Sequence, residues 1–303
     1  MGRAAAFHYA LRCLRGNAPA TAGWEECRDG VMPFSAADHT FVICAYGETE
    51  FLSDCVRSLC EQTLPTRILI ATSTPNDSIR RVAASYKLRL CINEGAPSIA
   101  HDWNCALGHC ETPLVTIAHQ DDVYAHQFAE LVLDYVNRAE HPLLAFTDYG
   151  EIRMGSHSGS DGIVVDNTKM LAVKRAMLAP LKHRKAWHNR PIRRRMMSLG
   201  SPICCPSVTY CLPNLPTPVF RSQMRGGLDW DAWERISRMQ GDFVYIPRIL
   251  MHHRIHLESE TSALIQDNIR SQEDLEMFRR FWPEPVARAL NGLYGLSLRS
   301  NNL

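Results

Sequence analysis

Between residues 40 and 147, short apolar segments rich in β-forming residues alternate with segments whose apolar residues recur at helical spacing. The predicted strands cover residues 40–45, 68–72, 88–92, 114–117 and 143–147, and the predicted helices cover residues 51–62, 79–86, 99–107 and 128–136. Strands and helices that alternate in this way form right-handed βαβ units around a mostly parallel sheet. The sequence therefore predicts an α/β, Rossmann-like fold in which helices flank the sheet.

The regular alternation ends after residue 150. A helix is predicted over residues 230–239, a strand over 243–246 and a polar helix over 262–281. We expect four parts along the chain. They are an N-terminal extension (1–38), an α/β half (39–150), a second half with a basic helical insertion at about 165–200 (151–262), and a C-terminal helical tail (263–303).

The net charge of +1 argues against nucleic acid as a partner, but this value hides an asymmetry. No Asp or Glu occurs from Asn167 to Leu228, although Lys and Arg recur there. Between residues 169 and 195, apolar positions lie opposite basic ones, which is typical of a helix at an anionic membrane surface. The alternative is a helix whose apolar side packs on the sheet. The membrane interpretation depends on Arg193, Arg194 and Arg195, which have no acidic residue nearby in sequence.

The cysteines and the apolar segments indicate the cellular compartment of the protein. The count of eleven cysteines is odd, no CxxC pair occurs, and no segment reaches the roughly 20 apolar residues of a membrane-spanning helix. The first residues, MGRAAAFHYALRCLRG, lack the apolar centre of a signal peptide. We therefore expect reduced cysteines and a cytoplasmic protein, peripheral at the inner face of a membrane if the basic helix binds there.

Two adjacent carboxylates, Asp121 and Asp122, follow the predicted strand at 114–117. Such a pair at the end of a buried strand is costly unless a cation offsets it. Ligands of open α/β sheets bind at this edge. Mg²⁺ and Mn²⁺ take oxygen ligands and usually combine one or two carboxylates with substrate phosphates. The pattern therefore predicts a site for a divalent cation and a diphosphate.

The order of several motifs resembles the inverting glycosyltransferases of family 2, which have the nucleotide-diphosphosugar (GT-A) fold. The resemblance covers residues 39–262. It is carried by five segments: FVICAYGETEFLSDCVRSLCEQT (41–63), NEG (93–95) with Asn104, HQDD (119–122), LDWDAWER (228–235) and HRIH (253–256). Two departures occur. His119 replaces the first aspartate of the metal motif, and Ser73-Thr74 replaces the aspartate pair that usually holds the nucleobase and ribose.

This resemblance implies a function. The chain would be an inverting, metal-dependent glycosyltransferase that moves a sugar from a nucleotide-diphosphate donor to a glycan or lipid-linked acceptor in polysaccharide biosynthesis. The resemblance implies Asp229 as the general base, with Asp231 as the alternative. The implied metal ligands are Asp121, Asp122 and His256, with His119 as a further candidate. The implied donor-binding residues are Ala45, Tyr46, Glu48, Ser73, Asn93, Asn104, Gln120, Asp121 and Arg254.

Other interpretations stay open. The segment AHQDD (118–122) is similar to the AHPDD motif of zinc-dependent sugar N-deacetylases, although Gln120 replaces its proline and several βα units precede it. A non-catalytic glycan-binding domain of the GT-A type is the third interpretation. Structural roles compete as well, because Asp121, Asp122 and Asp229 could cap helices. Trp230 and Trp233 could stack on sugar or belong to the core.

Overall fold

The structure is a computed structural model of the 303-residue chain and describes residues 32–154, 162–221, 224–256 and 269–299. Most of the predicted N-terminal extension and the first residues of the predicted polar helix lie outside the described residues. None of the helices described is both long enough and apolar enough to cross a membrane.

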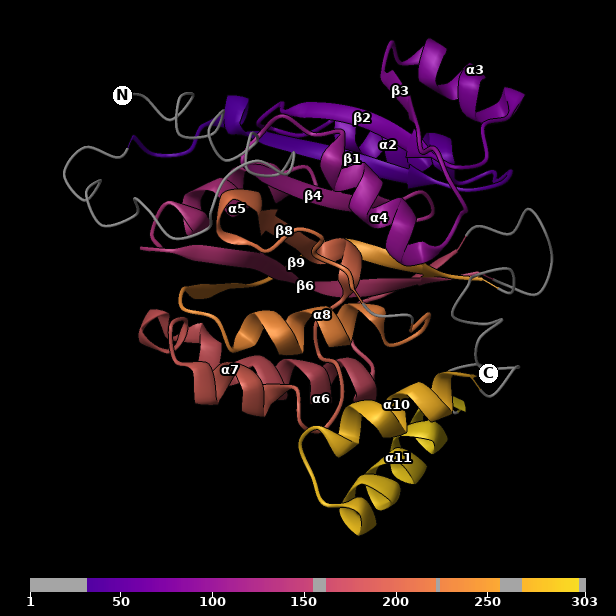
Figure 1. Cartoon of the computed structure of the whole chain (residues 1–303). Coiled ribbons are helices and arrows are strands. Elements are labelled where there is room, and N and C mark those ends of the chain that lie inside the picture. Colours follow the sequence, from indigo (N-terminus) through magenta and orange to yellow (C-terminus); the bar gives the residue numbers. More distant parts are fainter. Residues whose placement is uncertain (1–31, 155–161, 222–223, 257–268, 300–303) are drawn as a thin grey trace.

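A curved sheet of nine strands forms the centre of the described part (Figure 1). Its order is β3-β2-β1-β4-β8-β6-β9-β5, with β7 paired to β6. Strands β1 to β4, β6 and β9 run in one direction, whereas β5, β7 and β8 run in the other. The mostly parallel sheet predicted from the sequence is thus confirmed. The strands are β1 His39–Ala45, β2 Arg67–Thr72, β3 Arg89–Ile92, β4 Leu114–His119, β5 Val123–Tyr124, β6 Pro142–Arg153, β7 Ile163–Val165, β8 Val208–Cys211 and β9 Asp242–Ile255.

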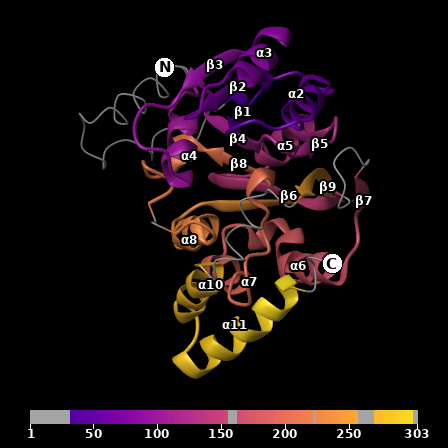
Figure 2. The same cartoon turned by 90° about the vertical axis from the view of Figure 1, so that its right-hand side faces the viewer.

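Helices cover both faces of the sheet. Helix α4 lies on one face, and α2 and α5 lie on the other (Figure 2). Helices α6, α7 and α8 form a layer beyond β6 and β9, and α10 and α11 lie beyond that layer (Figure 1). The helices are α2 Leu52–Cys60, α3 Asp77–Ser85, α4 Ile99–Gly108, α5 Phe128–Val136, α6 Lys169–Leu178, α7 Arg190–Met196, α8 Leu228–Ser237, α10 Ile269–Arg279 and α11 Glu284–Arg299. Short 3₁₀ helices are η1 Ala36–Asp38, η2 Ala179–Lys182, η3 Arg184–Ala186, η4 Cys205–Ser207 and η5 Leu212–Asn214.

Polar side chains fix where several helices begin. Asn76 accepts a hydrogen bond from the Ile79 N–H at the start of α3, and Thr168 accepts one from Leu171 at the start of α6. Ser98 does the same for α4. Each cap satisfies a backbone donor that has no partner inside the helix, which stabilises a helix by about 1 kcal/mol.

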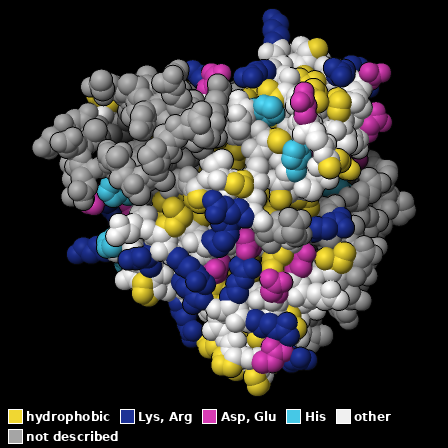
Figure 3. Space-filling model, viewed as in Figure 1, with side chains coloured by type: hydrophobic (Ala, Val, Ile, Leu, Met, Phe, Trp, Pro, Cys, Tyr) yellow, Lys and Arg dark blue, Asp and Glu magenta, His cyan; other side chains and the backbone are white. Residues whose placement is uncertain are grey.

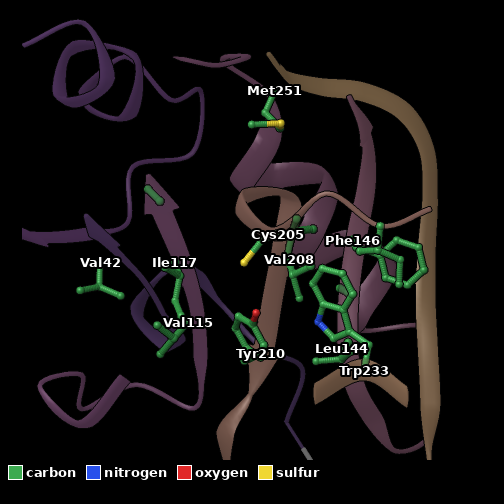
Figure 4. Close-up of a cluster of buried hydrophobic side chains, with 14 of the residues drawn as sticks. Val42, Val115, Ile117, Leu144, Phe146, Cys205, Val208, Tyr210, Trp233 and Met251 are labelled. Atoms are coloured by element: carbon green, nitrogen blue, oxygen red, sulfur yellow. The ribbon is translucent and has the colours of Figure 1, made fainter. Parts of the chain in front are cut away.

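One hydrophobic core joins the two halves of the described chain. Figure 4 shows Val42 and Ile117 from β1 and β4 on one side of Tyr210, and Trp233 of α8 on the other. Trp230 and Trp233 are both completely buried, so they belong to the core and do not form a sugar-stacking surface. The antiparallel strand β8 supplies Tyr210 and fills the gap between β4 and β6.

Strand β8 was not predicted from the sequence, and α11 was predicted only as part of the helical tail (263–303), without bounds of its own. Strand β8 has four residues and directly follows a proline-containing 3₁₀ helix, η4, so its pattern resembles a loop. Helix α11 contains Gly292 and Gly295, which have low helix propensity. Strands β6 and β9 are also longer than predicted, because they continue as a pair beyond the end of β4.

The basic segment 169–195 packs on the protein rather than forming one amphipathic helix. It comprises α6, η2, η3 and α7, and the apolar side chains of Leu171, Leu178 and Leu181 are buried. Arg193 is fully buried, where its guanidinium donates to the carbonyls of Met239 (2.6 Å) and Gly241 (2.8 Å).

The neighbouring arginines of α7 also contact the protein. Arg194 binds Glu234 (3.0 Å), and Arg195 stacks on the ring of Trp282. Although no acidic residue lies near Arg193, Arg194 and Arg195 in the sequence, the fold brings Glu234 to Arg194 and buries Arg193, so these arginines do not form one exposed cluster.

Candidate active site

The turn after β4 brings the predicted acidic pair next to the end of β9. Asp122 is completely buried, and its Oδ1 atom accepts hydrogen bonds from His253 Nδ1 (2.9 Å) and from the backbone N–H of Arg254 (2.9 Å). Its Oδ2 atom lies 3.9 Å from His119 Nδ1. Asp122 thus points into the protein and fixes the turn to β9.

The buried charge of Asp122 acts strongly on His253. Burial alone would lower the pKa of this imidazole, but the charge and hydrogen bond of Asp122 outweigh burial and raise the pKa to about 9. His253 is therefore a cation near neutral pH, and it compensates the carboxylate that would otherwise be unpaired in the interior.

Asp121 points in a different direction and meets His256. The two side chains are partly buried, and Asp121 Oδ2 lies 3.0 Å from His256 Nε2. Burial alone would raise the pKa of Asp121, but the hydrogen bond from His256 and the charges of nearby histidines lower it. The Asp121 carboxylate is accordingly held in its ionised form.

Arg254 lies beside this pair and is ordered by contacts on all sides. Its Nε atom donates to the carbonyl of Asp121 (2.8 Å), and its Nη2 atom lies 3.4 Å from Asp54 Oδ2. The guanidinium carbon stands 4.3 Å from the centre of the Phe51 ring. Asp121, predicted from one motif, and Arg254 and His256, predicted from another, are therefore neighbours at the end of the sheet.

The Asp121–His256 pair fits a cation that a ligand also coordinates. Within the ranges described, no group of three or more His, Cys, Asp or Glu side chains could hold a metal ion. A zinc site of the N-deacetylase type needs such a group, so the described residues do not support that alternative. The carboxylate of Asp121 suits a Mg²⁺ or Mn²⁺ ion that substrate phosphates complete, and the imidazole of His256 lies where it could be a further ligand. Asp122, which faces inward, stands behind this pair.

The structure does not use the acidic pair as a helix cap. The next helix, α5, begins after Gln127, so neither Asp121 nor Asp122 caps it. Helix α8 has Gly227 at its N-cap, and Asp229 lies in the first turn, where its Oδ1 atom accepts from the Trp230 N–H (2.6 Å). The capping role predicted as an alternative for these three aspartates is therefore not observed.

The two candidate bases, Asp229 and Asp231, have different surroundings. Asp231 is buried and forms ion pairs with Arg235 (3.1 Å) and Arg280 (2.6 Å), so its carboxylate is engaged within the fold. Burial raises the pKa of Asp229, while the charge of Arg270, the hydrogen bond from the Trp230 backbone N–H and the charge of Lys174 oppose that increase. Asp229 is thus an aspartate of raised pKa whose charge interacts with residues of α6 and α10.

The first strand and the turn after β4 form the predicted nucleotide side. Ala45 is buried at the end of β1, and the next residue, Tyr46, has 61% of its surface exposed. Gln120 holds the Tyr46 backbone from both sides, since it accepts from the N–H and donates to the carbonyl, each at 2.9 Å. Glu48 is exposed in the same loop. The Tyr46 ring therefore offers a free face at the sheet edge.

Asp102 is a site residue that the sequence did not predict. Its carboxylate accepts from Ser73 Oγ (2.9 Å) and from Asn93 Nδ2 (2.9 Å), which follow β2 and β3. An aspartate on α4 therefore lies at the position where the expected aspartate pair is replaced by Ser73 and Thr74. The only sequence signal was its place two residues before Asn104.

Asn104 and His119 connect the site to the segment around Phe220. Asn104 exchanges hydrogen bonds with the backbone of Phe220, at 2.7 and 3.1 Å, so it positions this segment. Trp103 stacks on the His119 ring, with centroids 5.3 Å apart, and contacts Phe220 edge-on. Burial lowers the pKa of His119, and its buried Nε2 atom has no hydrogen-bond partner among the residues that the structure describes. His119 is thus a neutral ring held by stacking.

Comparison with known proteins identifies what this arrangement resembles. A family model described as glycosyl transferase family 2 matches residues 40–200. No curated protein matches the chain.

Solved structures of three glycosyltransferases have a similar fold. The mannosyltransferase PcManGT from Pyrobaculum calidifontis, solved with GDP-Man and Mn²⁺, has 15% identity and a TM-score of 0.52 over 95% of this chain and 75% of that chain. S. aureus TarS 1-349 with UDP-GlcNAc has 11% identity and a TM-score of 0.51 over 84% of this chain and 70% of that chain. Glucosyl-3-phosphoglycerate synthase from Mycobacterium tuberculosis, solved with Mn²⁺ and UDP-Glc, has 15% identity and a TM-score of 0.50, covering 86% of this chain and 84% of that chain. At these identities the likeness concerns the shared GT-A fold.

Proposed function

The chain belongs to glycosyl transferase family 2, and we propose that it transfers a sugar, with inversion, from a nucleotide-diphosphate donor to an acceptor hydroxyl. The observation that carries this proposal is the convergence of Asp121, His256 and Arg254 at one end of the sheet. A partly buried aspartate of raised pKa, Asp229, lies in the first turn of α8. Together, these residues supply a binding place for a diphosphate and a carboxylate that can accept a proton.

The donor diphosphate would lie against Asp121, His256 and Arg254. A divalent cation bound by Asp121 and His256 would offset the negative charge that develops on the departing diphosphate. Arg254 is held in position by Phe51 and Asp54, and its guanidinium suits phosphate oxygens. Asp122 would support this site because it accepts hydrogen bonds from His253 and from the backbone of Arg254, which hold the end of β9 in place. The nucleotides named for similar structures, GDP-Man, UDP-GlcNAc and UDP-Glc, agree with a nucleotide-sugar donor.

The nucleobase and ribose would lie at the ends of β1, β2 and β3. The exposed Tyr46 ring offers a stacking face. Asp102, which Ser73 and Asn93 hold in place, offers a carboxylate acceptor for a base or ribose donor. We propose that Asp102 replaces the aspartates that the sequence lacks after β2.

Inversion requires a single displacement at the anomeric carbon. The acceptor oxygen forms a bond to that carbon while the bond to the diphosphate oxygen breaks, and Asp229 accepts the hydroxyl proton. Burial raises the pKa of Asp229 above its usual range, which makes it a better proton acceptor than an exposed aspartate. Asp231 is a weaker candidate, because Arg235 and Arg280 already bind its carboxylate.

The acceptor would be a glycan or a lipid-linked glycan. Peripheral attachment to an anionic membrane would depend on exposed basic side chains rather than on the buried Arg193. These side chains are Lys182, Arg184, Lys185 and Arg190. Lys and Arg side chains gather over α7 and its surroundings in Figure 3.

Two measurements test this function. The purified protein should be stabilised against heat by one nucleotide sugar from a panel, in the presence of Mg²⁺ or Mn²⁺, because a ligand that binds only the folded state stabilises it. It should then release the nucleoside diphosphate from that donor. A protein that binds no member of the panel and consumes none would be a non-catalytic domain, and the proposal would fail.

A further inference from the structure

The turn that leads into α8 is held by a carboxylate from the C-terminal helical tail. Glu273 of α10 accepts hydrogen bonds from three consecutive backbone N–H groups, those of Arg225 (2.8 Å), Gly226 (2.7 Å) and Gly227 (2.8 Å). Asp229, the proposed base, follows Gly227 by two residues and lies in the first turn of α8. One side chain of α10 therefore fixes the backbone that leads directly to the proposed base.

The turn has little of its own to hold it in one conformation. Gly226 and Gly227 have no side chains, and the backbone of glycine adopts more conformations than that of any other residue. Gly227 is the N-cap of α8 and cannot accept a hydrogen bond through a side chain. Glu273, which lies 46 residues further along the chain, supplies an acceptor for the backbone donors at this point. The conformation of the turn therefore depends on Glu273.

Helix α10 approaches the turn so closely that glycine is required there. A Cβ atom at Gly226 would stand 2.7 Å from Cδ of Arg270 and 3.3 Å from Oε2 of Glu273. The Arg270 side chain is itself held, since its Nε atom lies 3.2 Å from Oδ1 of the buried Asp274. The missing side chain at Gly226 thus allows α10 to contact the backbone of the turn.

Helix α10 is anchored on α8 by contacts that do not involve Glu273. Figure 2 shows the two helices next to each other, and the fully buried ring of Phe278 meets that of Trp230 edge-on, with centroids 5.2 Å apart. Arg280, directly after α10, forms an ion pair with Asp231 of α8 (2.6 Å). Because these contacts remain when the Glu273 carboxylate is removed, the effect of that carboxylate on the turn can be measured in a folded protein.

We propose that Glu273 is a positioning residue that acts through Asp229, because it holds the turn before α8 in the conformation that directs this carboxylate at the acceptor hydroxyl. This inference rests on the proposed function and adds the C-terminal helix α10 to its active site. Misplacement of a reacting group by about 1 Å can lower turnover by about 10²-fold. Turnover therefore depends on Glu273, although its carboxylate binds the backbone and not the substrate.

A purely structural role of Glu273 would give a different result. If Glu273 only fastened the helical tail, its removal would lower the melting temperature and leave the turnover of the folded protein unchanged. A positioning role lowers turnover and leaves donor affinity as it was. Its effect also disappears when Asp229 is absent, because the effects of two residues that act through one another are not additive.

The test compares wild-type protein with Glu273→Ala, Glu273→Gln and a control, Glu276→Ala. Glu276 has 60% of its side chain exposed, so its replacement removes a carboxylate from the same helix without touching the turn. Turnover of the nucleotide sugar that stabilises the protein is measured well below the melting temperature, and calorimetry measures binding of its nucleoside diphosphate with Mn²⁺.

We expect turnover to fall roughly 10–10²-fold in Glu273→Ala, with unchanged nucleoside diphosphate affinity. Glu273→Gln keeps the length of the side chain and one acceptor oxygen, so its turnover should lie between those of Glu273→Ala and wild-type protein. Glu276→Ala should match wild-type protein in both measurements.

The same two substitutions of Glu273 are then made in Asp229→Asn protein, where neither should lower the remaining turnover further. Glu273→Gln carries this comparison if Glu273→Ala does not fold. The inference is overturned if the Glu273 variants keep wild-type turnover, if they lose nucleoside diphosphate binding, or if they lower turnover equally with and without Asp229. Donor consumption by wild-type protein separates the two failures. If wild-type protein consumes its donor and the Glu273 variants match it, only the present inference fails, whereas a wild-type protein that consumes no donor overturns the proposed function and this inference with it.

Discussion

The carboxylate of Asp121 lies 3.0 Å from Nε2 of His256, although 135 residues separate them in the chain. Strand β9 makes this contact, because it continues past the end of β4 and pairs there with β5, which follows the acidic turn. The same strand supplies Arg254, whose Nε atom donates to the backbone carbonyl of Asp121 (2.8 Å). The long strand β9, which lies next to the edge strand β5, thus brings an imidazole to the carboxylate of Asp121 and a guanidinium to its backbone carbonyl.

Replacing either member of this pair should remove divalent-dependent transfer. Asp121→Asn exchanges an anionic ligand for a neutral amide, which is a poor ligand for a hard cation, and His256→Ala removes the second ligand. We expect donor turnover to fall at least a hundredfold in each variant, with a melting temperature close to that of wild-type protein. Turnover is measured with and without a chelator. Activity that survives exhaustive chelation in wild-type protein would exclude a role for the cation.

Asp229→Asn and Asp231→Asn should give opposite results. Asp229→Asn removes the proposed base, so turnover should fall by roughly 10²–10⁴-fold while calorimetry shows nearly unchanged donor binding. Asp231→Asn weakens hydrogen bonds to the charged groups of Arg235 and Arg280, so unfolding should require about 1.5–3 kcal/mol less free energy, with turnover largely kept.

The pH dependence of turnover provides a second check on Asp229. A base acts in its ionised form, so turnover should fall on the acid side as Asp229 takes up its proton. Because burial raises its pKa, this fall begins at a higher pH than for an ordinary aspartate. If Asp231→Asn is the inactive variant and Asp229→Asn keeps its turnover, the general base is Asp231 and not Asp229.

The fold could be predicted because its signal is local. Period-two and helical patterns of apolar residues determine which face each element buries, and they identified β1 to β4 with their helices. Pairing between distant strands has no local signal. Beyond the core, β6 and β9 continue because they pair with each other, and the pattern of apolar residues does not reveal this pairing. The sequence therefore predicted two much shorter strands.

The sequence predicted which residues form the candidate site, but not the directions in which their side chains point. Adjacent residues of an extended or turning chain point in different directions, and this separates Asp121, which faces His256, from Asp122, which faces inward. Two residues apart on a helix, Asp229 and Asp231 also lie on different faces. Asp102 escaped prediction because only the fold brings α4 next to the ends of β2 and β3.

Arg193 should be a stability residue, in contrast to its neighbour Arg195. Arg193→Ala leaves the buried carbonyls of Met239 and Gly241 without their donor and opens a cavity beside Phe243, which should lower the free energy of unfolding by about 3 kcal/mol. Arg195 is exposed, so Arg195→Ala should change it by no more than about 0.5 kcal/mol. Urea unfolding measures both, and equal effects would show that the buried contacts contribute little.

If the protein attaches to anionic membranes, the exposed lysines and arginines around η2 and η3 should carry the attachment. Each basic residue near such a surface contributes about 1 kcal/mol, so Lys182, Arg184 and Lys185→Ala together should release the protein from anionic vesicles in a co-sedimentation assay. The matched control replaces three exposed basic residues of the α3 region, Arg80, Arg81 and Lys87. Equal loss in both triple variants, or equal binding to zwitterionic vesicles, would contradict a specific basic surface.

His39 should make the fold sensitive to mild acid. It is fully buried, with its ring nitrogens 3.1 Å from Thr66 Oγ1 and 2.8 Å from Thr116 Oγ1, and burial lowers its pKa from 6.5 to about 3. Below pH 6.5 the unfolded chain therefore takes up a proton that the folded protein resists, so stability is lost as the pH falls. Between pH 7.5 and pH 5 this single group should cost about 2 kcal/mol of unfolding free energy.

The matched variant is His39→Gln, which keeps polar atoms near both threonines but cannot titrate. Other groups titrate equally in both proteins, so the difference between their stability losses isolates His39. Urea unfolding at pH 7.5 and pH 5 should show wild-type protein losing about 2 kcal/mol more than the variant, whatever the variant's stability at pH 7.5. Parallel losses would mean that His39 becomes protonated inside the folded protein, with Thr66 and Thr116 stabilising the charged ring.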